Sequence, residues 1–253
     1  MNFSPPSAHF SLVLAPLLKR MGLDVDMRVV RRGFVPVGGG EIRVTATAAA
    51  ACLAAITLVE QGTATKVVGS IVVAPGADPE AVEALKVALE YELPKVLPQT
   101  RPAVPVQITL EVCEDGKGRK KKPPPCAIQL AIHTTSSSIL SWNDLSKTPA
   151  TKDCALHTAK TARRAAKGVA TLLGSAAAVD EHTADQLIVW MALATGKSTM
   201  LAPLPAEQSS EHLATVLHFA QQMVPGCAIR VNEHADGLFI ECEGAGVPVP
   251  GRQ

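Results

Sequence analysis

The chain has 253 residues, of which 47% are hydrophobic, 19% charged and 3% aromatic. This length can bury a sizeable core in one large domain or two modest ones, and the composition excludes a disordered or fibrous chain. The net charge of +1 provides no general attraction to nucleic acid, so any such contact requires a local basic patch.

The six cysteines are widely scattered and form no C-x-x-C pair. This spacing argues against a structural zinc site and is typical of reduced thiols inside a cell. No apolar run is long enough to span a membrane, and the N-terminus lacks the pattern of a signal peptide. The sequence therefore predicts a soluble, intracellular protein.

The first predicted elements are a helix and two strands. Apolar residues recur at helical spacing over residues 9–21, and Gly22 ends the helix. Pro16 lies inside this pattern and should kink the helix or remove one of its hydrogen bonds. Alternation of apolar and polar residues then predicts strands over 25–30 and 41–47.

Between these strands lies RRGFVPVGGG, which begins with Arg31 and Arg32. Consecutive glycines let backbone N–H groups approach an anion, but they equally suit a tight connection between strands. The spacing matches neither a dinucleotide-binding fingerprint nor a Walker A loop, because a strand follows instead of a helix. Arg31 and Arg32 are either RNA phosphate contacts or solvated side chains.

A second group of elements follows, bounded near Gly62 and Pro149. Asp78 caps a helix over 80–93, with proline at its first position. The predicted strands of this β-α-β-β unit are 66–73, 104–112, 126–132 and a last short one at 139–142.

A basic run, GKGRKKKPPP, joins two of these strands and contains Lys120, Lys121 and Lys122. One interpretation is a contact with an RNA backbone or a nuclear targeting signal. The other is a solvated hairpin loop that its like charges and prolines keep extended.

The last third of the chain predicts three helices and a strand. Residues 151–173 form a helix with an alanine-rich stripe suited to close packing on a sheet. Asp180 caps a second helix that ends near Gly196, and residues 198–202 form a short buried strand. Ser209 or Ser210 caps a third helix. His212 lies in its first turn, where the helix dipole favours anions.

Several of these segments resemble the RNA 3'-terminal phosphate cyclases. The resemblance rests on Asp185-Gln186-Leu187, on His212 within HLATVLHFA, on the closing strand FIECEGAGV from Phe239 and on the segment from Arg32 to Glu41. These motifs occur in the family's order, and the resemblance spans nearly the whole chain.

The resemblance implies an α/β fold of the α+β type, built from β-α-β-α-β-β-like repeats with a small inserted α/β domain. The expected larger domain is discontinuous and comprises residues 1–62 and 150–253, and the expected insert comprises residues 63–149. The resemblance also implies that the chain begins after the N-terminal portion of a full-length cyclase. Missing strands would leave a sheet edge uncovered, which favours self-association.

The family chemistry places the nucleophile at His212, which would attack the α-phosphate of ATP and form a histidine-AMP intermediate. The adenylate would pass to an RNA 3'-phosphate, and the neighbouring 2'-hydroxyl would displace AMP and close a 2',3'-cyclic phosphate. Asp185 and Gln186 match the nucleotide-pocket pair, and His182 occupies the position of a tyrosine beside the adenine. A divalent metal, magnesium or manganese, would be held mainly by the nucleotide, since the sequence shows no protein metal cage.

Two further functions stay open. Glu211 beside His212 departs from the family pattern, and a cyclase-like protein of ribosome assembly shares the fold without the nucleophile. The alternatives are therefore a non-catalytic protein of ribosomal RNA biogenesis and a structural remnant without an RNA partner. For the enzyme, the resemblance implies RNA 3' ends as partners and a nuclear location.

Overall fold

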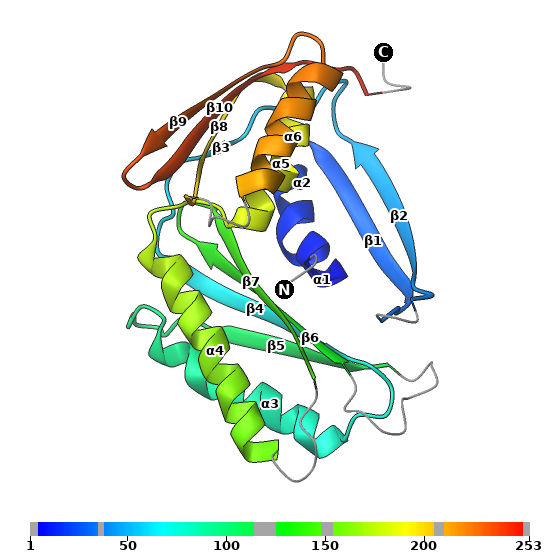
Figure 1. Cartoon of the computed structure of the whole chain (residues 1–253), viewed down its shortest axis with the longest axis vertical. Helices are drawn as coiled ribbons and strands as arrows, with labels where there is room; N and C mark the ends of the chain where they lie inside the picture. The colour runs from blue at the N-terminus through cyan, green and yellow to red at the C-terminus, as the bar shows by residue number, and fades with distance from the viewer. Residues whose placement is uncertain (1–4, 35–37, 114–124, 148–153, 205–209, 250–253) are drawn as a thin grey trace.

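The computed structural model describes residues 5–34, 38–113, 125–147, 154–204 and 210–249. Over these residues the chain forms three β-sheets with helices between and outside them (Figure 1). The predicted class, a mixed α/β fold, is confirmed.

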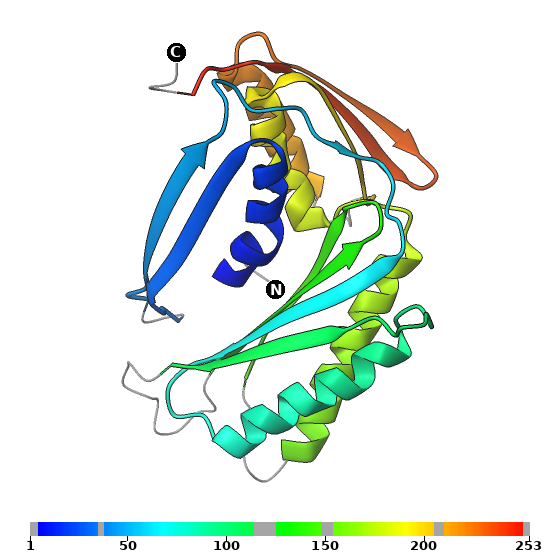
Figure 2. The same ribbon diagram turned by 180° about the vertical axis from the view of Figure 1, so that it is seen from behind.

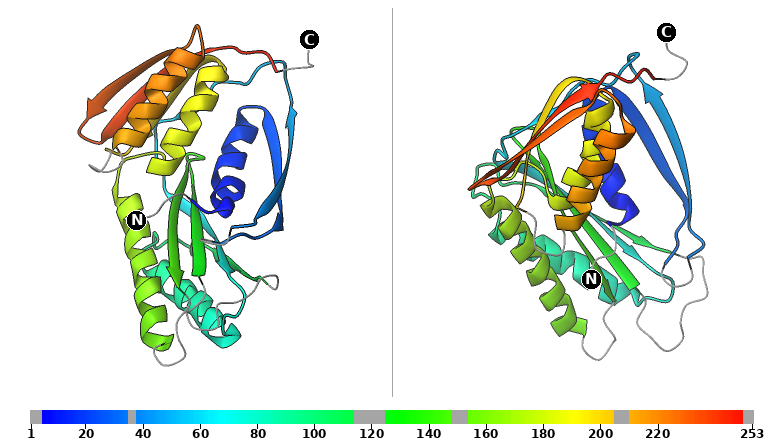
Figure 3. Two further views of the ribbon diagram at one scale, coloured as in Figure 1. Left: turned by 45° about the vertical axis from the view of Figure 1, so that its right-hand side comes forward. Right: turned by 45° about the horizontal axis from the view of Figure 1, so that its top comes forward.

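The first sheet is the antiparallel pair of β1 (Leu23–Arg31) and β2 (Glu41–Ala48). Before it the chain forms α1 (Ser7–His9), a π turn over Phe10–Leu14 and α2 (Ala15–Arg20). The π turn ends at Leu14, shortly before Pro16. The ring of Pro16 prevents the usual α-helical hydrogen bond to the carbonyl four residues earlier. The predicted interruption of the helix is thus observed. Figure 3 shows this helical segment between the hairpin and α5.

The second sheet carries two helices on one face, α5 (Glu181–Leu193) and α6 (Ser210–Met223). In sheet order its strands are β3 (Thr57–Leu58), β8 (Thr195–Ala202), β10 (Gly237–Ala245) and β9 (Ala228–His234). Leu17 and Leu18 of α2 join Leu187 and Ile188 of α5 in one core, and all four are fully buried. This core fixes α5 against both the sheet and the N-terminal helix.

The third sheet has its own core. In sheet order its strands are β5 (Val106–Val112), β4 (Ala64–Val73), β6 (Pro125–Thr134) and β7 (Ile139–Lys147). One face is covered by α3 (Pro79–Glu92), with a short 3-10 turn over Leu93–Lys95, and by α4 (Cys154–Gly174), as Figure 2 shows from behind. β4 lies between β5 and β6, so these two strands do not pair with each other. The prediction that the basic run forms the loop of a hairpin is therefore wrong. That run itself lies almost wholly outside the described residues.

Helix α4 packs beside α3 on this third sheet, through Ala162, Ala165 and Val169. The sequence pattern had predicted packing on a sheet, which is confirmed. Its range, however, falls within residues 150–253, which were expected to belong to the larger domain. A boundary at residue 149 or 150 therefore separates α4 from the sheet on which it packs, while the division into domains stays a prediction.

Candidate functional site

The N-terminal ends of α5 and α6 lie at the same end of the second sheet, because the two helices run in the same direction along it (Figure 1). Helix N-termini present unpaired N–H groups and a positive partial charge, so this end of the sheet favours anions. Three predicted nucleotide-binding residues, His182, Asp185 and Gln186, occupy the first turns of α5, and His212 occupies the first turn of α6.

The capping residue Asp180 holds the start of α5 in place. Its Oδ1 accepts hydrogen bonds from the backbone N–H groups of His182 and Thr183, both at 3.1 Å. Its Oδ2 accepts one from the Thr183 hydroxyl at 2.6 Å and one from the backbone N–H of Ser141 on β7 at 3.0 Å. The predicted N-cap is confirmed, and the same carboxylate also ties the third sheet to the candidate site.

His9 of α1 lies in this cluster as well. It is 1% exposed, its Nδ1 lies 3.1 Å from the Ser141 hydroxyl, and its ring meets the His182 ring edge to face at 6.4 Å between centroids. Burial lowers the pKa of His9, although the charge of Asp180 acts in the opposite direction. In the sequence, His9 is a histidine without a partner pattern, which is typical of a surface or satisfied core residue. No local pattern singles it out, since its neighbours in the cluster come from distant parts of the chain.

Asp185 is the most unusual polar group of the site. Its Oδ1 is buried and has no hydrogen-bond partner among the described residues. Burial raises the pKa of Asp185, and the nearby His182 and His212 oppose this rise. Because both histidines act electrostatically on Asp185, the predicted residues of α5 and α6 lie near one another. An unpaired acceptor beside them suits a hydroxyl donor from a ligand.

His212 is exposed, as a nucleophile that must reach a bound nucleotide requires. Gln186 is half-buried on the same turn of α5 as Asp185. The roles of His182, Asp185, Gln186 and His212 stay predictions.

Of the residues predicted to contact RNA, the structure describes Arg31 and Arg32, and neither belongs to this cluster. Arg32 donates to both carboxylate oxygens of Glu111 at 2.8 and 2.6 Å, so its charge is already paired. This hydrogen-bonded pairing raises the pKa of Arg32 and lowers that of Glu111. Arg31 is exposed and donates from Nε to the Gly39 carbonyl at 2.6 Å. Lys120, Lys121 and Lys122 lie outside the described residues.

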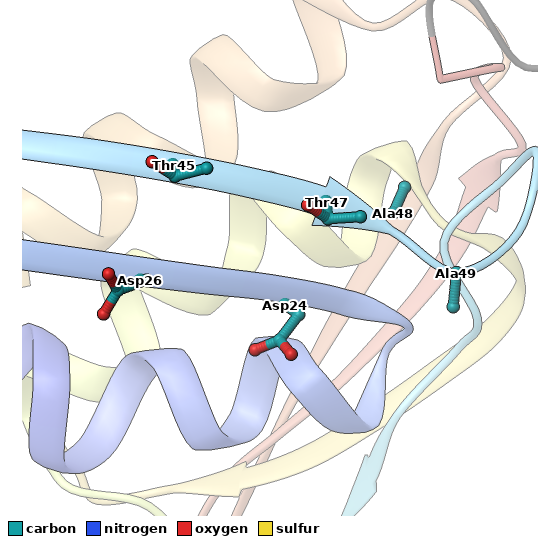
Figure 4. Close-up of a pocket in the computed structure, with 6 residues that line it drawn as sticks. All are labelled: Asp24, Asp26, Thr45, Thr47, Ala48 and Ala49. Atoms are coloured by element: carbon teal, nitrogen blue, oxygen red, sulfur yellow. The ribbon is translucent and has the colours of Figure 1, made fainter.

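The outer face of the β1–β2 hairpin carries a shallow depression of about 470 Å³, shown in Figure 4. Asp24 and Asp26 of β1 lie there beside Thr45 and Thr47 of β2, and Asp24 pairs with Lys19 at 3.0 Å. Over the described ranges, no group of three His, Cys, Asp or Glu side chains is placed to hold a metal ion. None of the described helices is both long enough and apolar enough to cross a bilayer.

Comparison with known proteins identifies the family. The family model "RNA 3'-terminal phosphate cyclase" matches residues 1–230. RNA 3'-terminal phosphate cyclases of Pyrobaculum neutrophilum and Drosophila melanogaster are each 26% identical over 97% of this chain, and that of Salmonella agona is 30% identical over 88%. The matched regions span 64%, 63% and 57% of these relatives, so the chain covers less than two thirds of their length. On the family match, the chain belongs to the RNA 3'-terminal phosphate cyclase family.

Proposed function

We propose that this chain converts an RNA 3'-terminal phosphate to a 2',3'-cyclic phosphate at the expense of ATP, with His212 as the group that carries the adenylate. The observation that carries the proposal is the meeting of two helix N-termini, which sets exposed His212 near the buried, unpaired Oδ1 of Asp185. Such a surface suits a ligand that carries an anionic group and hydroxyl groups, because a helix N-terminus favours the anion and Asp185 Oδ1 can accept a hydrogen bond from a hydroxyl.

The residues present fit ATP. The positive end of α6 suits its phosphates, whereas the first N–H groups of α5 are already bonded to Asp180. The unpaired Asp185 oxygen suits a ribose hydroxyl, and the half-buried His182 ring can stack on a base. A divalent metal, magnesium or manganese, would offset phosphate charge, and we propose that the nucleotide supplies most of its ligands.

The first step forms a bond between a neutral ring nitrogen of His212 and the α-phosphorus. It breaks the bond to the bridging oxygen, pyrophosphate leaves, and the ring loses its proton. An oxygen of the RNA 3'-phosphate then takes the adenylate from His212. Finally, the neighbouring 2'-hydroxyl attacks the phosphorus of the RNA 3'-phosphate, the bond from that phosphorus to the oxygen of AMP breaks, and AMP leaves. Exposure of His212 lets both the nucleotide and the RNA end reach the same nitrogen.

Covalent labelling tests this proposal. Incubation with ATP radiolabelled at the α-phosphate, plus magnesium or manganese, should leave an acid-labile, alkali-stable label on the protein. His212→Ala should abolish it. His218→Ala is the matched control, because His218 is an exposed histidine two turns further along the same helix and should be dispensable. Asp185→Asn should reduce labelling at least about tenfold, since a charge-assisted hydrogen bond is lost.

The same variants separate chemistry from folding. The melting temperature of Asp185→Asn should be unchanged or raised, because one carboxylate oxygen, Oδ1, is buried without a partner and burial raises the pKa of Asp185, which disfavours its charged form in the folded chain. Labelled protein should also render the 3'-phosphate of an RNA resistant to phosphatase. An unlabelled wild-type chain would contradict the enzymatic proposal and favour the non-catalytic role in ribosomal RNA biogenesis. The nuclear location stays a prediction.

Self-association is a separate prediction. Within the described part of the chain, β2 pairs only with β1, and seven of its eight residues are exposed, including Ile42 at 56% and Val44 at 50%. A strand with exposed apolar side chains and an open edge is a template for pairing with another copy. We expect concentration-dependent dimers in sedimentation velocity experiments, and we expect Val44→Lys to suppress them. A wild-type chain that stays monomeric at every concentration would refute this.

A further inference from the structure

A groove of about 590 Å³ separates the β1–β2 hairpin from the third sheet. The hairpin contributes Arg31 and Phe34, the N-terminal segment contributes Ser7 and Ala8, and the sheet supplies the floor. None of the predicted nucleotide-binding residues lines it. Its floor is the face of the sheet opposite to α3 and α4.

The floor carries a polar row across three strands. Ser70 of β4 lies opposite Gln129 of β6, and Gln129 lies opposite Asn143 of β7. Directly opposite residues of antiparallel strands share a face, so all three side chains belong to the groove, which each of them lines. Their neighbours along the chain, such as Ile71 and Ile128, belong to the other face and are fully buried in the core. The row is polar and uncharged.

Gln129 is the key residue of this row. It is 1% exposed, and its Nε2 donates to the Leu130 carbonyl at 3.0 Å. This bond fixes which end of the amide is the oxygen, and that oxygen, Oε1, has no partner among the described residues. A buried, unpaired amide oxygen is unfavourable unless a ligand supplies a donor. The last torsion of a glutamine is soft, so the amide can release the Leu130 carbonyl and turn Oε1 towards a donor that enters the groove.

The walls of the groove indicate the kind of ligand. Phe34 offers a ring to a planar partner, and Arg31 makes no ion pair with any described residue. The ion pair of Arg32 with Glu111, together with its 2.7 Å bond to the Ser7 hydroxyl, holds the hairpin to the sheet. Two acidic residues are also among the residues that line the groove. Asp144 lies opposite Ile128, so its carboxylate belongs to the other face, where it pairs with Arg164 of α4. Glu41 lies across the hairpin from Arg31.

An uncharged row of hydrogen-bonding groups beside an aromatic ring matches a nucleobase, which has a polar edge and an apolar face. The Arg31 guanidinium at the rim of the groove can pair with the negative charge of a phosphodiester. Helix α1 connects the groove with the candidate active site. Ser7 and Ala8 line the groove, and the next residue, His9, packs on His182. An RNA strand with its 3' end at His212 would run past α1 to reach the groove.

We propose that this groove binds one nucleotide of the RNA strand upstream of the reacting 3' end. The base lies on the polar row and donates an N–H to Gln129 Oε1, Phe34 contacts the face of the base, and Arg31 contacts the backbone phosphate. This inference rests on the proposed function, because it assigns a subsite to the same RNA substrate.

Fluorescence anisotropy with a 5'-labelled oligoribonucleotide that ends in a 3'-phosphate, in the absence of ATP, tests the proposal. Gln129→Leu should weaken binding by about threefold to tenfold, the worth of one hydrogen bond, without changing the salt dependence. Arg31→Ala should weaken binding and reduce the salt slope by about one. Lys86→Ala is the matched control, because this lysine lies on α3, on the other side of the sheet, and its loss should change neither quantity.

The thermal stability of Gln129→Leu distinguishes a lost contact from a damaged fold. The melting temperature should be unchanged or higher, because the variant removes an unpaired polar atom. Equal affinity of Gln129→Leu and the wild type for the oligonucleotide would overturn the proposal. A loss confined to AMP added as a free nucleotide would overturn the assignment to an RNA strand.

The binding measurement is independent of the adenylyl transfer. No ATP is present in the binding measurement, so no adenylate forms on His212 while affinity is measured. If covalent labelling fails while Gln129→Leu still weakens binding, the proposed adenylyl transfer is refuted and the assignment of the groove to RNA stands. If labelling succeeds and the wild type does not bind the oligonucleotide, the assignment of the groove to RNA is refuted and the proposed adenylyl transfer stands.

Discussion

Replacement of Asp180 by alanine should lower the free energy of unfolding by about 3 kcal/mol, since it removes an N-cap and leaves buried donors unpaired. The side chain is 3% exposed and accepts four hydrogen bonds, from Ser141, His182 and Thr183. Urea denaturation followed by circular dichroism measures this loss. Labelling with ATP should fall as well, because the bond to Ser141 sets β7 and His9 against the start of α5.

Asp78→Ala is the matched control for this effect. Asp78 caps α3 through a single bond to the backbone N–H of Glu80 at 3.1 Å, in an exposed setting. Loss of this cap should lower the free energy of unfolding by about 1 kcal/mol, the usual value for an N-cap. If the two replacements were equally destabilising, the additional bonds of Asp180 to Ser141 and to the Thr183 hydroxyl would have no energetic role.

Gly244→Ala should destabilise the chain by about 2 to 3 kcal/mol, because overpacking against backbone cannot be relieved by a side-chain rotation. A Cβ at this position of β10 would collide with the carbonyl oxygens of Met191 and Ala194 at the end of α5. The helix would have to move away from the sheet, and its N-terminal residues would move with it. Thermal unfolding measures the loss of stability.

Gly174→Ala provides the comparison. Gly174 is the last residue of α4, and no atom lies within 4 Å of the position that its Cβ would occupy. The substitution should be neutral or should stabilise the chain by about 0.4 to 1 kcal/mol, because alanine restricts the unfolded chain. A similar loss in both variants would show that the effect of Gly244→Ala does not arise from its contact with α5.

Local sequence signals predicted most of the secondary structure. Asp78 and Pro79 located the start of α3, and Asp180 located the start of α5, because a cap and a first-turn proline act within a few residues. Two strands were not predicted. β3 has only two residues, and β9 is largely exposed, so neither presents a clear alternation of buried and exposed positions.

The candidate site was predictable only in part. His182, Asp185, Gln186 and His212 stand in motifs that the chain shares with a family, so their positions followed from the sequence. His9 did not, because its significance lies in contacts with Ser141 and His182, which are more than 130 residues away along the chain. Gln129 was also missed, since a lone glutamine in a strand becomes notable only when its oxygen is buried without a partner.

The sequence alone determined the family, the mixed α/β class and the caps of the principal helices, because these depend on short motifs and on periodicity along the chain. Tertiary structure decided that β4 lies between β5 and β6, that α4 packs beside α3, and that Asp180 joins the third sheet to the site. It also decided that Ser70, Gln129 and Asn143 form one polar row. Strand order and register arise from contacts between distant segments, which no local pattern records.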